Sequence, residues 1–295
     1  MVDLNVLGRL GFGAGAIGNL YRAMRDEDAA ATVRSAWDAG LHYYDTAPHY
    51  GFGLSEKRLG RALAEVNPEQ RAIVSTKVGR RLDPVPPGTD LSVPRQAFVT
   101  PEPFESVFDY SYDAVMRSYE ASRARLRRDR IHILYAHDIG RMTHGDDHPR
   151  RFAEFMEGGY RAMRELRDSG AVGAIGLGVN ETQVCEEVMA VGEIDLVLLA
   201  GRYTLLEQEA LETFLPLCER RGVRIVLGGP YNSGILAKGV RGGGELHYNY
   251  EPAPPAIVAR VGAIEDICAA HDVPLAAAAL QLPSPTRRWS RSFPA

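Results

Sequence analysis

Apolar runs of strand length alternate with segments of helical periodicity along most of the chain. The strand-like runs lie near residues 9–14, 41–45, 72–77, 131–136, 172–178, 194–200 and 223–228. The helical segments lie near residues 27–39, 55–66, 111–127, 159–168, 181–191, 207–220 and 256–271. Alternation of this kind is typical of parallel strands joined by crossover helices.

The number of these units and the chain length favour one fold. The chain has 295 residues and no change of composition that would mark a linker. A barrel of the (β/α)8 type takes roughly 250 residues in one domain. We therefore predict an α/β protein, a (β/α)8 TIM barrel that occupies residues 1–282.

A competing fold is a doubly wound dinucleotide-binding sheet. The stretch GAGAIG, residues 13–18, follows a strand-like run and matches the G-x-G-x-x-G fingerprint. In that fold the last glycine opens the helix directly. Here the helix is expected to begin only at Asp26, so the match favours a loop.

Two long loops follow strands and are expected on the active-site face of a barrel. They are the Pro- and Arg-rich segment 79–103 and the segment 138–150. The second contains HGDDH, residues 144–148, which has the side chains of a metal site but no evident third anchored ligand. We interpret it as a polar lid loop and predict no metal.

Charge and composition exclude several classes of protein. The net charge of −4 gives no electrostatic case for binding nucleic acid or an anionic membrane. The three cysteines, Cys185, Cys218 and Cys268, are far apart and odd in number, which argues against a disulfide framework. No stretch approaches the roughly 18 apolar residues of a membrane span. We expect a soluble cytoplasmic protein that acts on a small molecule.

Titratable side chains occur at the ends of consecutive strands. The second strand ends at Asp45, the third carries Lys77 and the fourth carries His137. Tyr50 follows Asp45 on the next loop, in the stretch YYDTAPHYG. Because the carboxyl ends of barrel strands surround the active site, these side chains are expected to meet there.

Together these residues suit proton transfer at a carbonyl or alcohol oxygen. A tyrosine hydroxyl titrates near ~10, and a neighbouring ammonium such as Lys77 lowers its pKa. A carboxylate such as Asp45 would keep the lysine charged, and His137 could orient the reacting oxygen. The set supplies no hydride, so redox chemistry would need a nicotinamide cofactor.

The stretch GLHYYDTAPHYGFGLSEKRLGRAL, with STKVG and LYAHD, resembles the signatures of the aldo-keto reductase superfamily, in order from about Leu10 to Leu282. The resemblance implies a catalytic tetrad of Asp45, Tyr50, Lys77 and His137, with Tyr50 as general acid and base. Further stretches (GAGAIGNLY, AGRYTLLEQ and GGPYNSGILA among them) resemble the branch that contains L-fucose, D-threo-aldose and L-galactose dehydrogenases and pyridoxal 4-dehydrogenase. That branch oxidises a cyclic hemiacetal to a lactone.

The resemblance also implies NAD or NADP as cofactor. The loop from Asn232 to Leu236 is expected to meet the pyrophosphate through backbone N–H groups. Three positions depart from the wider family: Val179 replaces a serine, Ala200 a glutamine and Gly228 a stacking tyrosine. The expected cofactor-binding residues are Gly13, Asn180, Tyr203, Asn232, Ser233, Gly234 and Leu236.

Three alternatives to a hemiacetal dehydrogenase remain at this point. One is an aldo-keto reductase that reduces another carbonyl substrate. A second is an aldolase of the same fold that uses Lys77 as a Schiff-base nucleophile. The third is an impaired or regulatory relative. The sequence leaves the substrate, the choice of NAD or NADP and the oligomeric state open.

The family pattern stops near Leu282. The family continues with a strand that ends in Ile-Pro-Gly and with a final helix, whereas this chain reads LPSPTRRWSRSFPA. The codons of this tail, read one base earlier, can spell Pro-Leu-Ala-His-Pro-Ala-Val-Val-Ser-Val-Ile-Pro-Gly. We therefore expect residues 283–295 to be a frameshifted, non-family tail, and the barrel to lack strand eight and the last helix.

Overall fold

The computed structural model describes residues 4–282, which form two compact units. Within the described residues, the first unit ends at Gly178 and the second begins at Val179. The expectation of a frameshifted tail concerns residues 283–295, which lie outside the described residues.

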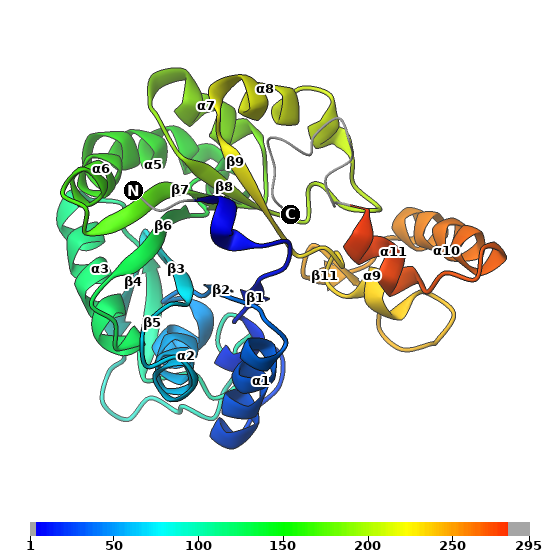
Figure 1. The fold of residues 1–295 in the computed structure, drawn as a ribbon, viewed down its shortest axis with the longest axis horizontal. Coiled ribbons are helices and arrows are strands. Elements are labelled where there is room, and N and C mark those ends of the chain that lie inside the picture. Colours follow the sequence, from blue (N-terminus) through cyan, green and yellow to red (C-terminus); the bar gives the residue numbers. More distant parts are fainter. Residues whose placement is uncertain (1–3, 283–295) are drawn as a thin grey trace. The chain divides into compact units, whose positions relative to one another are not determined.

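The first unit contains a sheet of parallel strands (Figure 1). Its strands, in spatial order, are β1 (Phe12–Gly13), β2 (Tyr43–Asp45), β3 (Ile73–Val78), β6 (Ile131–His137) and β7 (Val172–Val179). Every residue of β2, β3 and β7 is buried. This explains why these strands show no regular alternation of apolar and polar residues, as is usual for parallel strands covered on both faces.

Helices follow these strands and lie on their outer side in Figure 1. They are α1 (Asp26–Asp38), α2 (Leu54–Val66), α3 (Tyr112–Leu126), α5 (His148–Glu154) and α6 (Tyr160–Asp168). A one-turn helix, α4 (Arg141–His144), precedes α5 along the chain. Helix α2 buries Leu59, Ala62 and Leu63, which share one face at helical spacing. Helix α1 begins at Asp26, which confirms the predicted start and excludes the dinucleotide-fingerprint geometry for residues 13–18.

The segment 79–103, expected as a loop, begins instead with the first strand of a two-stranded antiparallel hairpin. Strand β4 (Arg80–Pro84) pairs with β5 (Phe104–Phe108), and Arg80 lies opposite Phe108. The sequence RRLDP has neither the apolar alternation nor the β-branched residues that predict a strand. The hairpin is therefore fixed by its pairing and not by local propensity.

Gly79, between β3 and the hairpin, allows the chain to turn past Tyr110. Its φ is +96°, and a Cβ at this position would lie 2.4 Å from the Tyr110 ring. The Tyr110 hydroxyl in turn donates to the carbonyl oxygens of His137 and Asp138, at 2.8 and 3.0 Å. Any side chain at residue 79 would therefore push on the end of β6.

We expect Gly79→Ala to reduce the free energy of unfolding by about 1–3 kcal/mol or more, because it adds a clash to an unfavourable φ. Gly88→Ala is the matched control, since Gly88 has φ +86° but no atom within 4 Å of a Cβ. Urea denaturation of both variants separates the two contributions. Equal stability losses in the two variants would contradict the proposed clash with Tyr110.

The second unit contains two parallel strands and a group of helices. The strands β8 (Leu196–Ala200) and β9 (Arg224–Gly228) pair in register, and β10 (His247–Tyr248) forms a small antiparallel pair with β11 (Glu251–Pro252). The helices are α7 (Gln183–Val191), α8 (Phe214–Arg221), α9 (Ile235–Lys238), α10 (Pro255–Ala270) and α11 (Leu275–Gln281).

In the second unit, helix α8 starts later than the sequence predicts, and a hydrophobic cluster joins the three last helices. Helix α8 begins at Phe214 and not near residue 207, because Pro216 is tolerated only in the first turn of a helix. A hydrophobic cluster holds α9, α10 and α11 together; its buried members are Leu206, Ile235, Leu236, Val261 and Ala279.

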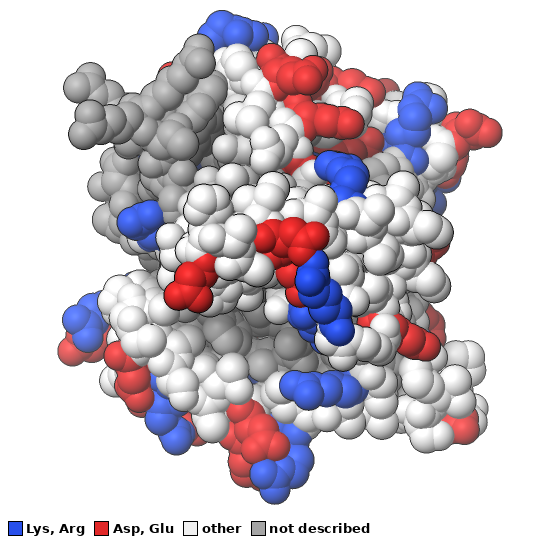
Figure 2. Space-filling model, turned by 90° about the vertical axis from the view of Figure 1, so that its right-hand side faces the viewer, with Lys and Arg blue, Asp and Glu red and all other residues white. Residues whose placement is uncertain are grey.

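Acidic and basic side chains are mixed on the surface shown in Figure 2. Figure 2 shows basic and acidic residues interspersed with uncharged surface on one face. Between residues 4 and 282, no helix is long and apolar enough to span a membrane. Cys185, Cys218 and Cys268 are free thiols and all are buried.

Candidate active site

A buried ion pair lies at the ends of β2 and β3. The Lys77 ammonium donates to Asp45 Oδ2 at 2.6 Å and to the Thr46 carbonyl oxygen at 2.8 Å. The exposed fractions of the two side chains are only 2% and 12%. Burial alone lowers the pKa of Lys77, but Asp45 and Tyr50 outweigh it and raise that pKa. Lys77 is therefore a charged ammonium at neutral pH.

A chain of hydroxyl groups supports the other oxygen of Asp45. Ser75 Oγ donates to Asp45 Oδ1 at 2.7 Å. Since the single Ser75 proton is used there, the Tyr43 hydroxyl at 2.9 Å must donate to Ser75, and Tyr135 at 3.2 Å to Tyr43. Burial raises the pKa of Tyr43 and Tyr135, so both remain protonated. Each hydrogen bond in this series of hydroxyl groups therefore points its proton toward the Asp45 carboxylate.

Tyr50 begins a short 3-10 turn, Tyr50–Gly53, directly beside the ion pair. Lys77 Nζ lies 4.8 Å from the centre of the Tyr50 ring. Burial raises the pKa of Tyr50, whereas the charge of Lys77 lowers it. The direction of the lysine effect is the one expected from the sequence, but burial dominates and the pKa of Tyr50 stays above its usual value.

His137, the last residue of β6, lies near Tyr50 with the ring centres 6.0 Å apart. Its exposed fraction is 6%. Burial, together with the charges of Arg80 and Lys77, holds the pKa of His137 well below its usual range. The first unit thus brings Asp45, Tyr50, Lys77 and His137 into one cluster, with His137 as a neutral imidazole.

Three further polar residues, which the sequence pattern did not single out, belong to this cluster. Arg80 donates to Asp138 at 2.6 Å and its guanidinium stacks on Phe108 at 4.3 Å. The His49 ring lies 3.3 Å from Arg80 and 5.9 Å, centre to centre, from His137. Burial and Arg80 lower the pKa of His49 to about 2. Arg80 and Asp138 each lie just beyond a strand end, so the rule that found the other residues could have found them.

Aromatic residues form an apolar wall beside Tyr50. Phe98, from the insertion, is 2% exposed, and its ring centre lies 6.3 Å from Tyr50 and 5.2 Å from His49. The insertion therefore contributes both Arg80 and Phe98 to the surroundings of Tyr50, as its predicted position after a strand implies.

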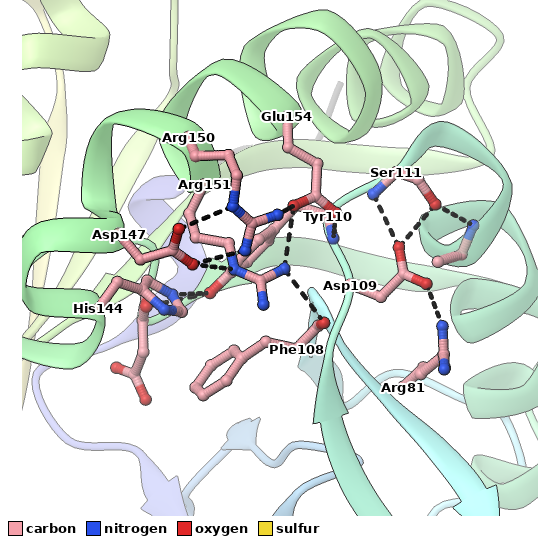
Figure 3. Close-up of polar contacts among 12 residues, drawn as sticks. Arg81, Phe108, Asp109, Tyr110, Ser111, His144, Asp147, Arg150, Arg151 and Glu154 are labelled. Atoms are coloured by element: carbon pink, nitrogen blue, oxygen red, sulfur yellow. Dashed lines mark hydrogen bonds and ion pairs between the residues drawn. The ribbon is translucent and has the colours of Figure 1, made fainter.

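The loop after β6 is tied to the end of the hairpin by a polar network (Figure 3). Arg151 contacts Asp147, Glu154 and the Phe108 carbonyl oxygen, and Glu154 accepts from the Tyr110 amide. His144 Nε2 lies 3.0 Å from the Tyr110 hydroxyl. The HGDDH segment is thus used for contacts within the protein. Among residues 4–282, no group of three or more His, Cys, Asp or Glu side chains could hold a metal ion.

Gly13, the one cofactor residue expected from the first unit, lies at the end of β1 opposite Asp45. It is exposed, and no atom lies within 4 Å of the position of a Cβ. A ligand could approach the backbone closely at this point.

The other expected cofactor residues lie in the second unit. Asn180 follows β7, and Tyr203 is partly buried after β8. Asn232 is 4% exposed; its side chain donates to the Gly201 carbonyl oxygen and accepts from Thr204. The amides of Asn232, Gly234 and Leu236 donate within their own loop.

The loop that contains these residues has an unusual backbone. Its positive φ values fall at Gly229, Asn232, Ser233 and Gly234, a run in which successive N–H groups can face one side. The amide, hydroxyl and phenol groups present here fit the polar groups of a nicotinamide dinucleotide. The amides that already donate within the loop would have to be released before they could bind pyrophosphate.

The chain belongs to the aldo/keto reductase family, whose sequence model matches residues 9–282. It is therefore an NAD(P)-dependent oxidoreductase of that family, and the predicted (β/α)8 barrel is confirmed as its fold class. It is similar to pyridoxal 4-dehydrogenase of Microbacterium luteolum, with 44% identity over 93% of this chain and 81% of the relative. It is also 40% identical to D-threo-aldose 1-dehydrogenase of a Pseudomonas species, over 93% of this chain and 80% of the relative.

Solved structures give the same fold. Glycerol dehydrogenase AKR11B4 from Gluconobacter oxydans matches with a TM-score of 0.66 and 21% identity, over 92% of this chain and 78% of that one. Aldo-keto reductase AKR11C1 from Bacillus halodurans matches with a TM-score of 0.64 and 24% identity, over 92% and 76%.

Proposed function

We propose that this enzyme oxidises a cyclic hemiacetal to a lactone with NAD or NADP. The substrate is an aldose such as L-fucose or L-galactose, or pyridoxal in its internal hemiacetal form. The observation that carries the proposal is the buried Asp45–Lys77 pair beside Tyr50 and His137, in a chain 44% and 40% identical to a pyridoxal dehydrogenase and an aldose dehydrogenase.

In this proposal Tyr50 removes the hydroxyl proton of the hemiacetal. Tyr50 accepts this proton as the phenolate and becomes a neutral phenol; Lys77 stabilises the phenolate that exists before the transfer, and Asp45 keeps Lys77 charged and in place. His137 hydrogen-bonds the reacting oxygen and orients it. A bound nicotinamide would supply the hydride acceptor for the adjacent C–H bond. The hemiacetal carbon thus loses a hydride and its oxygen loses a proton, which leaves the lactone carbonyl.

We propose that the cofactor is bound by polar groups of this chain. The proposed residues are Gly13, Asn180, Tyr203, Asn232, Ser233, Gly234 and Leu236. Gly13 offers open backbone, and the loop with left-handed residues would offer amides for phosphate once their present bonds within the loop are released.

The charge of Lys77 disfavours the aldolase alternative. A Schiff base forms from a neutral amine, but Asp45 and Tyr50 raise the pKa of this lysine. Two of the three ammonium protons already face Asp45 and Thr46. A carbonyl reductase of the same mechanism remains the second candidate, because the same groups can return the proton to an alkoxide.

A substrate screen tests the function directly. We expect reduction of NAD or NADP, followed at 340 nm, with at least one of L-fucose, L-galactose, D-arabinose and pyridoxal. The product should hydrolyse to an acid, as a lactone does. If the enzyme oxidises none of these compounds but consumes NADH or NADPH rapidly with simple aldehydes, the proposed activity is wrong. The enzyme would then be a carbonyl reductase.

A further inference from the structure

Asp138 has a backbone conformation that few residues adopt. Its φ is +51°, in the left-handed region, and its exposed fraction is 8%. Asp and Asn tolerate this region better than other non-glycine residues, but the conformation persists only where the surroundings hold it. Here the Tyr110 hydroxyl donates to the Asp138 carbonyl oxygen, and the Asp138 amide donates to the carbonyl oxygen of Gly178 at 3.0 Å. The carboxylate is therefore held in a fixed direction.

That direction is toward Arg80 and His137. Asp138 Oδ2 accepts from Arg80 Nη2 at 2.6 Å and lies 3.5 Å from His137 Nε2. Arg80 is itself held between the Phe108 ring and the His49 ring. One carboxylate oxygen thus faces both a fixed guanidinium and the imidazole of the candidate site.

The other nitrogen of His137 has no such neighbour. His137 Nδ1 is buried and has no hydrogen-bond partner within residues 4–282. A proton on Nδ1 would bury an unpaired N–H donor and turn the Nε2 lone pair toward the Asp138 carboxylate. Nδ1 stays without a partner in either form, but a proton on Nε2 faces the Asp138 carboxylate and replaces the repulsion between that carboxylate and a lone pair by an attraction. The surroundings therefore favour the Nε2–H form.

We propose that Asp138 and Arg80 are positioning residues that act through His137: Asp138 keeps the imidazole proton on Nε2, and Arg80 holds the Asp138 carboxylate in place. This inference rests on the proposed function, in which His137 donates to the reacting oxygen. With the proton on Nε2, the ring presents an N–H donor without carrying a charge.

The charges around His137 keep it neutral. The groups that face it are Arg80 on β4, Lys77 on β3, His49 and Tyr50 on the loop after β2, and Asp138 next to it. Burial and Arg80 are the two largest contributions that lower the pKa of His137. Removal of Arg80 takes away one of these positive charges, so the pKa of His137 should rise.

Nuclear magnetic resonance of the full chain with 15N-labelled histidine reads the proton position directly. The sequence has eight histidines, and the His137 signals are identified by their loss in His137→Gln. We expect the wild-type signals of an Nε2–H neutral ring. Asp138→Asn, which keeps an acceptor oxygen, should retain them, whereas Asp138→Leu should shift the proton to Nδ1 or to a mixture. A wild-type ring protonated on Nδ1 would overturn the proposal.

Arg80→Met is the second variant, and it leaves Asp138 intact. We expect the titration midpoint of His137 to rise toward its ordinary value. Arg81→Met is the matched control, because Arg81 lies next to Arg80 on β4 but pairs with Asp83 and Asp109. If His137 has the same titration midpoint in Arg80→Met and Arg81→Met, Arg80 does not act on His137 as proposed.

Steady-state kinetics connect the proton position to turnover. Asp138→Leu should lower kcat by roughly ten- to a hundredfold, as is usual for the partner that orients a functional imidazole. The change in KM should be smaller, and Asp138→Asn should restore most of kcat. Loss of kcat in Asp138→Leu with the proton still on Nε2 would show a merely structural role. The resonance result does not depend on turnover, so failure to oxidise any hemiacetal would contradict only the proposed function.

Discussion

Tyr50→Phe is expected to lose nearly all turnover while its affinity for the cofactor stays close to that of the wild type. The substitution deletes only the hydroxyl that carries the transferred proton and leaves the ring against His137 and Phe98. Proton transfer by a positioned side chain contributes about a hundred- to ten-thousandfold to rate, so kcat should fall by that factor. Initial rates and calorimetric titration with NAD and NADP measure the two effects.

The control for this variant is Tyr112→Phe. Tyr112 also donates through its hydroxyl, to Glu165, but it lies on the exposed surface of α3. Its loss should leave kcat unchanged. Turnover in Tyr50→Phe within a factor of two of the control would exclude Tyr50 as the group that transfers the proton.

Lys77→Met is expected to destabilise the protein strongly and to shift its activity to higher pH. It leaves the Asp45 carboxylate buried without its charged partner, which typically costs about 3–5 kcal/mol. It also removes the charge that lowers the pKa of Tyr50, so this pKa rises further and the phenolate forms only at higher pH. Urea denaturation and the pH dependence of kcat/KM measure these changes.

The double variant Asp45→Asn/Lys77→Met separates the two effects. It removes both charges, so part of the lost stability should return, whereas the alkaline shift of activity should remain. If Lys77→Met unfolds at the same urea concentration as the wild type, the pair is not the buried interaction described above. If its residual activity keeps the wild-type pH profile, Lys77 does not control Tyr50.

Much of the fold could be predicted because its strands are buried on both faces. The runs expected near 72–77, 131–136 and 172–178 correspond to β3, β6 and β7 within one or two residues. The hairpin of β4 and β5 could not, because the segments that pair are far apart and polar. Its strands depend on contacts that no local pattern records.

The residues of the candidate site also differ in how clearly the sequence marks them. Asp45, Lys77 and His137 are conspicuous because each interrupts or ends an apolar run. Ser75 had a weaker signal, as it shares a strand face with Lys77 by the alternation of side chains. Arg80 and Asp138 also lie just beyond strand ends, but they look like ordinary loop residues in the sequence, and their contact at 2.6 Å is what joins them to the site.

The buried Lys77–Asp45 pair can form while the rest of the chain is still being synthesised. It joins residues 32 positions apart, and the Tyr43–Tyr135 contact beneath it joins residues 92 apart. Both contacts close within the first half of the sequence, which leaves the ribosome first and generally folds first. A nascent chain can therefore pair these two buried charges before the second unit is synthesised. We expect substitutions that break this pair to appear in cells as aggregation during translation, before any loss of activity in the finished enzyme can be measured.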